Sequence, residues 1–241
     1  MTTAHTTVLV VVSADTEWRA LRRILGVEPT GSTPYGECID APLTIRSLPI
    51  SLTYVQGGWG KISAAASAQQ AIDRWHPDIL VNLGTCGGIA GRVEIGETIL
   101  AERTFVYDII EQMLDPQDAL SHYATDLDLS WLSQPFPHPV RKTCLLSADR
   151  DGIPDQVPEL EAQYSAVALD WESGAIAWVA SKNRTRCLIL RTVTDVVSRD
   201  GDEAYDGTGE LFRRRAEEAM GGLIDGLPAW LRCAKLGPPS D

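Results

Sequence analysis

Three acidic residues stand at the ends of apolar runs that are typical of buried strands, namely Glu17, Glu172 and Asp195. Ligands of α/β proteins bind beyond strand ends, so we expect the three carboxylates to meet in one cleft. Carboxylates in that arrangement suit the cleavage of the bond between the base and the sugar of a nucleoside. One can protonate the departing base, one can activate water, and one can hold the sugar hydroxyls. For any one of them alone, capping a helix is an equally good explanation.

The elements that must position these residues follow from the apolar pattern of the chain. Strands are expected at residues 8–12, 43–48, 51–55, 78–83, 95–105, 143–147, 166–169 and 187–194. Helices are expected after a cap at Asp15 and at residues 61–75, 172–181 and 209–231. This alternation predicts a single α/β domain over residues 1–241, with a mixed, mostly parallel β-sheet flanked by helices on both faces.

Two further segments are expected near the strand ends. The glycine-rich segment 84–88 contains Thr85, and its glycines would let the backbone approach a ligand in a loop. Asp149 follows another predicted strand and falls at the same edge of the sheet. The polar stretch 108–139 contains several prolines and is expected to form a long excursion over the site.

The composition excludes several classes of function. The chain has 241 residues and a formal net charge of -12, which argues against nucleic acid as a partner but not against an uncharged nucleoside. Its five cysteines are widely spaced, without a CxxC pair or a Cys/His cluster, so no metal site is expected. We expect no organic cofactor either. No secretory signal pattern or membrane-length apolar run is present, and we expect a cytoplasmic protein without membrane contact.

Two glycine-rich segments invite a nucleotide-binding interpretation, which their spacing does not support. Gly60-Lys61 is followed by Ile62 and lacks the first glycine of a P-loop. Segment 84–88 lacks the GxGxxG spacing of a dinucleotide fold, which argues against a dinucleotide-dependent oxidoreductase. A tight turn required only for packing remains an alternative for this segment.

Five segments in order along nearly the whole chain resemble the nucleoside phosphorylase superfamily, and within it the methylthioadenosine/S-adenosylhomocysteine nucleosidases. The segments are Ser13-Ala14-Asp15-Thr16-Glu17, Gly58-Trp59-Gly60-Lys61, Asn82-Leu83-Gly84-Thr85-Cys86-Gly87-Gly88, Leu169-Asp170-Trp171-Glu172 and Arg191-Thr192-Val193-Thr194-Asp195. Any one segment would be a weak signal. Their shared order and spacing identify the superfamily.

The resemblance implies a role for each matching residue. Asp195 matches the family's general acid, which protonates or hydrogen-bonds N7 of the purine. Glu17 matches the carboxylate that activates water, and Glu172 matches the residue that holds the 2′- and 3′-hydroxyls of the ribose. Arg191 and Thr85 match residues around the attacking water. These roles agree with the physical requirements, because cleavage builds negative charge on the base and positive charge on the sugar.

The same comparison favours hydrolysis over phosphorolysis and indicates an altered pocket. Asn82 stands where phosphorylases of this superfamily typically carry an arginine, and Glu17 would repel phosphate. Trp171 replaces the methionine that usually lies beneath the sugar. The family also places a base-stacking aromatic residue soon after Asp149, and segment 150–153 has none. We still expect substrate contacts from this loop, through Asp149, Gly152 and Ile153.

These observations together predict a hydrolase that cleaves a 5′-substituted adenine nucleoside. Futalosine-type hydrolysis and phosphorolysis are alternatives within the superfamily. A catalytically silent nucleoside-binding protein is an alternative of another class, which the complete set of Glu17, Glu172 and Asp195 disfavours. Members of the family pair so that a neighbour's loop covers the 5′ end, so we expect a homodimer in which Phe105 or Tyr107 plays that part.

Overall fold

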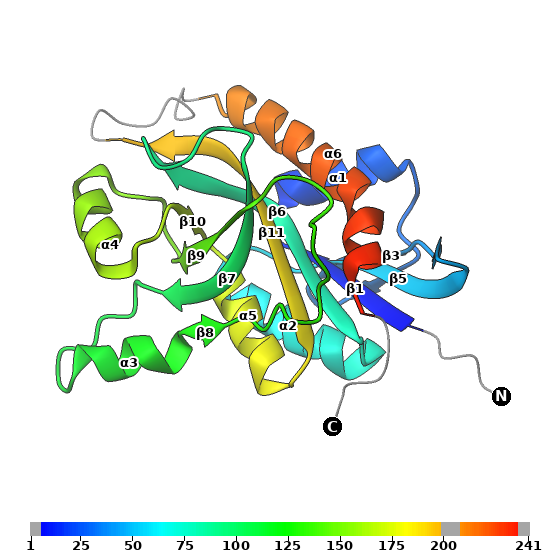
Figure 1. Ribbon diagram of the computed structural model, residues 1–241, viewed down its shortest axis with the longest axis horizontal. Helices are drawn as coiled ribbons and strands as arrows, with labels where there is room; N and C mark the ends of the chain where they lie inside the picture. Colours follow the sequence, from blue (N-terminus) through cyan, green and yellow to red (C-terminus); the bar gives the residue numbers. More distant parts are fainter. Residues whose placement is uncertain (1–5, 199–207, 236–241) are drawn as a thin grey trace.

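The computed structural model describes residues 6–198 and 208–235 (Figure 1). Its strands are β1 (Thr6–Val12), β2 (Gly31–Thr33), β3 (Gly36–Asp40), β4 (Leu43–Ile45), β5 (Leu48–Gln56), β6 (Ile79–Ile89), β7 (Thr98–Val106), β8 (Thr125–Asp126), β9 (Arg141–Ser147), β10 (Ala168–Asp170) and β11 (Arg186–Val197). Its helices are α1 (Asp15–Leu25), α2 (Gly60–Trp75), α3 (Pro116–Tyr123), α4 (Val157–Tyr164), α5 (Ser173–Lys182) and α6 (Glu210–Cys233).

The strands form one mixed sheet in the order β10-β9-β7-β11-β6-β1-β5-β3-β2, which confirms the expected fold class. Strand β1 lies parallel between β5 and β6, and β11 lies parallel to β6. Strand β10 pairs with both β9 and β6, so strands β6, β11, β7, β9 and β10 close on themselves. Antiparallel pairings at β2, β3, β4 and β7 make the sheet more mixed than the sequence predicted.

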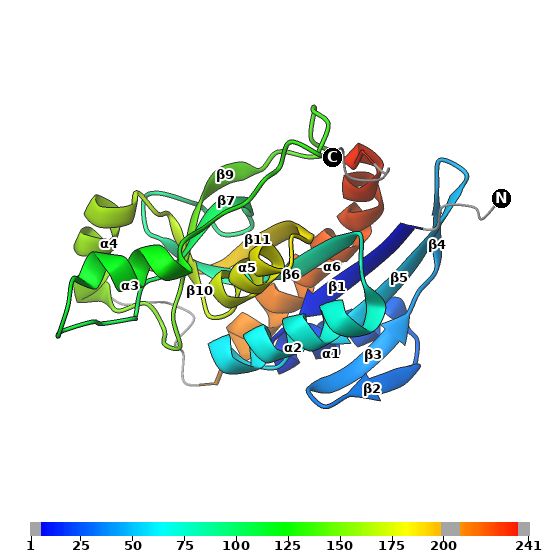
Figure 2. The ribbon, with the colours of Figure 1, turned by 90° about the horizontal axis from the view of Figure 1, so that it is seen from below.

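Helices cover both faces of the sheet, as Figures 1 and 2 show. Val8, Val10 and Val12 of β1 pack into the apolar cluster under α1 and α6, whereas Leu9 and Val11 pack into the cluster under α2 and α5. Strand β1 is apolar throughout because both of its faces are buried. Among the described residues, every helix is too short or too polar to cross a lipid bilayer.

Several expected elements differ in the structure. The strand expected at 43–48 is two strands, because Arg46 and Ser47 adopt positive φ angles of 49° and 65° and turn the chain back on itself. Strand β6 continues through residues 84–88, where a loop was expected. Asp15 is the first residue of α1 and does not cap it; the N-cap is Ala14, whose N–H donates to the Glu17 carboxylate at 3.3 Å.

Candidate active site

A cavity of about 530 Å³ opens beyond the carboxyl ends of β1, β10 and β11, beside the end of β6. The structure therefore brings together side chains from parts of the chain that are far apart in sequence. Six of the residues expected at the site line this cavity: Glu17, Thr85, Gly152, Trp171, Glu172 and Asp195.

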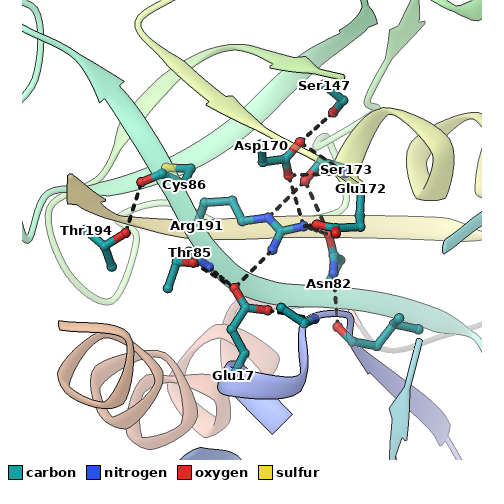
Figure 3. Close-up of polar contacts among 12 residues, drawn as sticks. Glu17, Asn82, Thr85, Cys86, Ser147, Asp170, Glu172, Ser173, Arg191 and Thr194 are labelled. Carbon is teal, nitrogen blue, oxygen red and sulfur yellow. Dashed lines mark hydrogen bonds and ion pairs between the residues drawn. The ribbon is translucent and has the colours of Figure 1, made fainter. Parts of the chain in front are cut away.

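The floor of the cavity is built around the fully buried guanidinium of Arg191 (Figure 3). Its Nη2 lies 2.9 Å from Asp170 Oδ2 and donates to Asn82 Oδ1 at 2.8 Å, while its Nε donates to Ser173 Oγ at 3.0 Å. Burial alone would lower the pKa of Arg191, but the carboxylates of Asp170, Glu17 and Glu172 raise it above its usual value. The floor is therefore a fixed positive charge beneath a ring of carboxylates.

Glu17 lies beside this floor and is held by Thr85. Its Oε1 accepts the backbone N–H of Thr85 at 2.6 Å and the Thr85 hydroxyl at 2.8 Å. Nη1 of Arg191 lies 3.9 Å from the same oxygen and has no hydrogen-bond partner within the described part of the chain. A Cβ at Gly84 would lie 1.8 Å from that nitrogen, so glycine is needed here for the guanidinium to reach Glu17.

Glu172 stands on the opposite side of the guanidinium. Its Oε1 accepts the N–H of Gly60 at 3.1 Å, and its Oε2 lies 3.9 Å from Arg191 Nη2. Burial raises the pKa of Glu172 to about 8; the charge of Arg191 opposes this rise, and the nearby carboxylates of Asp170 and Glu17 add to it. This carboxyl group is thus readily protonated near neutral pH.

Asp195 reaches the cavity because β11 contains a bulge. Val193 pairs with Cys86 and Asp195 pairs with Gly87, which leaves Thr194 as an extra residue in the ladder. Simple alternation along the strand would place Asp195 on the face of Val193, whereas the bulge turns it to the other face. The Thr194 hydroxyl donates to Asp195 Oδ1 at 2.7 Å.

The rim of the cavity is aromatic, and sequence reasoning missed part of it. The rings of Trp59 and Trp171 stack with centroids 5.3 Å apart and an interplanar angle of 27°. Phe212 of α6 also lines the cavity. Trp59 could have been found from its place between two glycines in one of the five recognised segments. Nothing distinguishes Phe212 in the sequence from the other apolar residues of its helix.

Two residues expected to bind substrate do not line the cavity. Asp149 instead accepts the backbone N–H of Lys61 at 2.7 Å and holds the start of α2. Ile153 is 39% exposed. Their neighbours Arg150, Asp151 and Gly152 supply the cavity wall at this point.

Phe105 and Tyr107 also lie away from the lining residues of this chain's cavity. Phe105 packs on Tyr164 with ring centroids 5.0 Å apart, and Tyr107 is buried. The Arg150 guanidinium lies 5.2 Å from the centroid of the Tyr107 ring, so Tyr107 supports a residue of the cavity wall.

The segment 108–139 does not cover the cavity, so that expectation was wrong. Its strand β8 pairs with β7, and its helix α3 lies against α5. Trp131 and Leu132 are buried in the cluster under α6, and this apolar anchorage draws the segment away from the site.

Within residues 6–198 and 208–235, no group of three His, Cys, Asp or Glu side chains is arranged to hold a metal ion.

Residues 45–227 match the family model of the phosphorylase superfamily, and the chain belongs to that superfamily. Among curated proteins it is 28% identical over 160 residues to a 5′-methylthioadenosine/S-adenosylhomocysteine nucleosidase of Maridesulfovibrio salexigens, covering 61% of this chain and 69% of the relative. It is 26% identical over 156 residues to the protein of the same name from Thermotoga maritima, covering 64% and 70%.

Solved structures of similarly named proteins share the fold. The Helicobacter pylori 5′-methylthioadenosine/S-adenosylhomocysteine nucleosidase with butyl-thio-DADMe-Immucillin-A superimposes with a TM-score of 0.73 at 14% identity, covering 95% of this chain and 98% of the other. The Arabidopsis thaliana 5′-methylthioadenosine nucleosidase in apo form gives 0.71 at 21% identity, covering 94% of each chain. The resemblance found in the five segments is confirmed.

Proposed function

We propose that this protein hydrolyses the N-glycosidic bond of a purine nucleoside, with a 5′-substituted adenine nucleoside as the leading substrate. The observation that carries the proposal is the placement of Glu17, Glu172 and Asp195 around one cavity above the buried Arg191. The names of the similar proteins support the same reaction class and the adenine nucleoside.

Each residue has a role in this proposal that fits its contacts. Asp195 donates a proton or hydrogen bond to the base as negative charge develops there. Glu17 takes a proton from a water molecule held by the Thr85 hydroxyl and by Nη1 of Arg191, both of which are directed at its Oε1. Glu172 accepts hydrogen bonds from the ribose hydroxyls. The negative charge of Glu17 stabilises the positive charge that builds on the sugar.

The charge of the cavity supports water rather than phosphate as the nucleophile. Its lining includes six acidic residues, and these face a single lining arginine, Arg150: Asp15, Glu17, Asp151, Asp170, Glu172 and Asp195. A phosphate ion would be repelled by Glu17, the carboxylate beside which we place the nucleophile. Asn82 does not line the cavity but holds Arg191 in place. Its Oδ1 accepts a hydrogen bond from the guanidinium, and its Nδ2 donates one to the carbonyl of Val11 at 3.0 Å.

The test is an assay of base release from methylthioadenosine, S-adenosylhomocysteine, adenosine, inosine and futalosine, with and without phosphate. Hydrolysis gives a free ribose derivative at a rate that does not depend on phosphate. A sugar 1-phosphate product, with a rate that rises with phosphate, would assign phosphorolysis. Binding of a nucleoside without any base release would assign a silent binding protein, and a preference for futalosine would replace the adenine nucleoside as substrate.

We further propose that the protein is a cytoplasmic homodimer. Ile62, Ile110, Met113 and Leu114 are 73–91% exposed, and the contact of Lys61 with Asp108 brings their two segments beside each other. A second copy would bury this apolar surface, and Phe105 or Tyr107 of each copy would then approach the other's cavity. Free cysteines suit a reducing compartment. Sedimentation of the wild type and of Ile62→Glu tests the dimer.

A further inference from the structure

A cluster of three charged side chains lies beside the cavity, outside the residues that the proposed reaction uses. In this Lys61 cluster, Nζ of Lys61 contacts the carboxylate of Asp108 and lies 3.7 Å from Asp149 Oδ2. The side chains of Lys61 and Asp108 are only 20% and 16% exposed. The backbone N–H of Asp149 donates to Asp108 Oδ2 at 3.0 Å, which closes the cluster.

The cluster joins three segments that are distant in the sequence. Lys61 is the second residue of α2, directly after Trp59 and Gly60, while Asp108 follows β7 and Asp149 follows β9. The Asp149 carboxylate also accepts the backbone N–H of Lys61, an anion at a helix N-terminus, where it is favourable. One ammonium group therefore holds two carboxylates that would otherwise repel each other at this junction.

Two walls of the cavity begin at this junction. The N–H of Gly60, next to Lys61, donates to Glu172, and Trp59 stacks on Trp171. Arg150, next to Asp149, also lines the cavity. A shift of either loop would move the N–H that orients Glu172 and would separate the tryptophan pair.

We propose that Lys61 is a positioning residue, which ties together the loops after β5 and β9 and so fixes Glu172 and Trp59 for binding of the substrate's sugar. Only the kinetic effect expected from this proposal rests on the proposed function. Lys61 does not reach the cavity itself, so its loss should weaken substrate binding more than it slows the chemical step.

The kinetic test compares Lys61→Met, Lys61→Arg and the control Lys142→Met, using the best nucleoside from the wild-type assay. Lys142 forms an ion pair with Glu102 at 2.9 Å on the surface, away from the cavity. We expect KM to rise about tenfold in Lys61→Met with kcat within about threefold of the wild type. Lys61→Arg should recover most of the loss, and Lys142→Met should match the wild type. A kcat loss with unchanged KM, or no change at all, would overturn the proposal.

A spectroscopic test separates this proposal from the proposed function. Tryptophan rings held in a fixed environment give a near-ultraviolet circular dichroism signal, and the difference between the wild type and Trp59→Phe gives the part that depends on the contact of Trp59 with Trp171. We expect this signal to fall in Lys61→Met and to return in Lys61→Arg, under conditions where both variants remain folded by far-ultraviolet measurement. An unchanged signal in folded Lys61→Met contradicts the proposed junction even if the wild type releases base. A lost signal supports it even if no nucleoside is cleaved.

Discussion

The floor and the rim of the cavity are held in different ways. The floor consists of Asn82, Asp170, Ser173 and Arg191, which are at most 6% exposed and joined by hydrogen bonds and an ion pair. The rim is led by Trp59, which is 69% exposed and held by a ring contact. The difference indicates that the floor holds the groups that take part in the reaction in fixed positions, whereas the rim determines which substrate binds.

The largest expected effect comes from breaking the floor. Asp170→Ala leaves the buried guanidinium of Arg191 without its nearest carboxylate, and loss of one partner of a buried pair costs about 3–5 kcal/mol in unfolding free energy. Denaturant unfolding measures this. The control is Glu102→Ala, which breaks the exposed pair with Lys142 and should cost about 1 kcal/mol or less. Equal effects of the two substitutions would show that the floor is not specially fixed.

The next effect concerns the chemical step. Asp195→Asn preserves the shape of the side chain and removes its proton, so we expect turnover to fall by about a hundredfold or more, the range of general acid catalysis. Thermal unfolding of the variant serves as the control, since the change should leave the fold intact. Turnover close to that of the wild type on a good purine nucleoside would remove Asp195 from the mechanism.

A smaller effect is expected from the protonation of Glu172. Its pKa is raised from 4.5 to about 8, so the folded protein binds this proton more tightly than the unfolded chain does. The resulting stabilisation is complete below the unfolded pKa and is lost as the pH rises through about 8. Glu172→Gln mimics the protonated group, so its Tm relative to the wild type should improve with rising pH. Parallel Tm profiles for the two proteins would contradict the raised pKa.

The smallest expected effect lies at the rim. With Trp171 in the cavity and no aromatic residue in segment 150–153, we expect poor kcat/KM on methylthioadenosine compared with some other 5′-modified purine nucleoside. Trp171→Met restores the residue usual in the resembling nucleosidases and should change this preference by about 1 kcal/mol, or roughly fivefold. If methylthioadenosine is clearly the best substrate of the wild type, the differences at the rim do not change the substrate preference.

The sequence predicted the floor better than the rim for a physical reason. Strand residues such as Arg191 lie in short apolar runs whose burial fixes their place in the sheet, whereas the bulge that turns Asp195 into the cavity has no mark in the apolar pattern. The same runs identified β1, α2 and α6 to within a few residues. The position of Glu17 followed because it lies in the first turn of the helix that comes directly after such a strand.

The rim depends on contacts between distant segments, which no local sequence pattern predicts. Phe212 reaches the cavity from the first turn of the last helix, α6, and Trp59 is placed by a ring on another segment. Asp149 was expected in the cavity because it follows a strand, but the nearby Lys61 ammonium and N–H draw it to α2. The pairing partner of a charged side chain, rather than its place after a strand, decided where it lies.

The extra residue in β11 has a consequence for changes in chain length. Deletion of Thr194 would leave Val193 opposite Cys86 and Asp195 opposite Gly87 in a regular ladder, so Asp195 would keep its face and lose only its hydroxyl donor. This strand can therefore shorten by one residue at the bulge without losing its acid from the cavity.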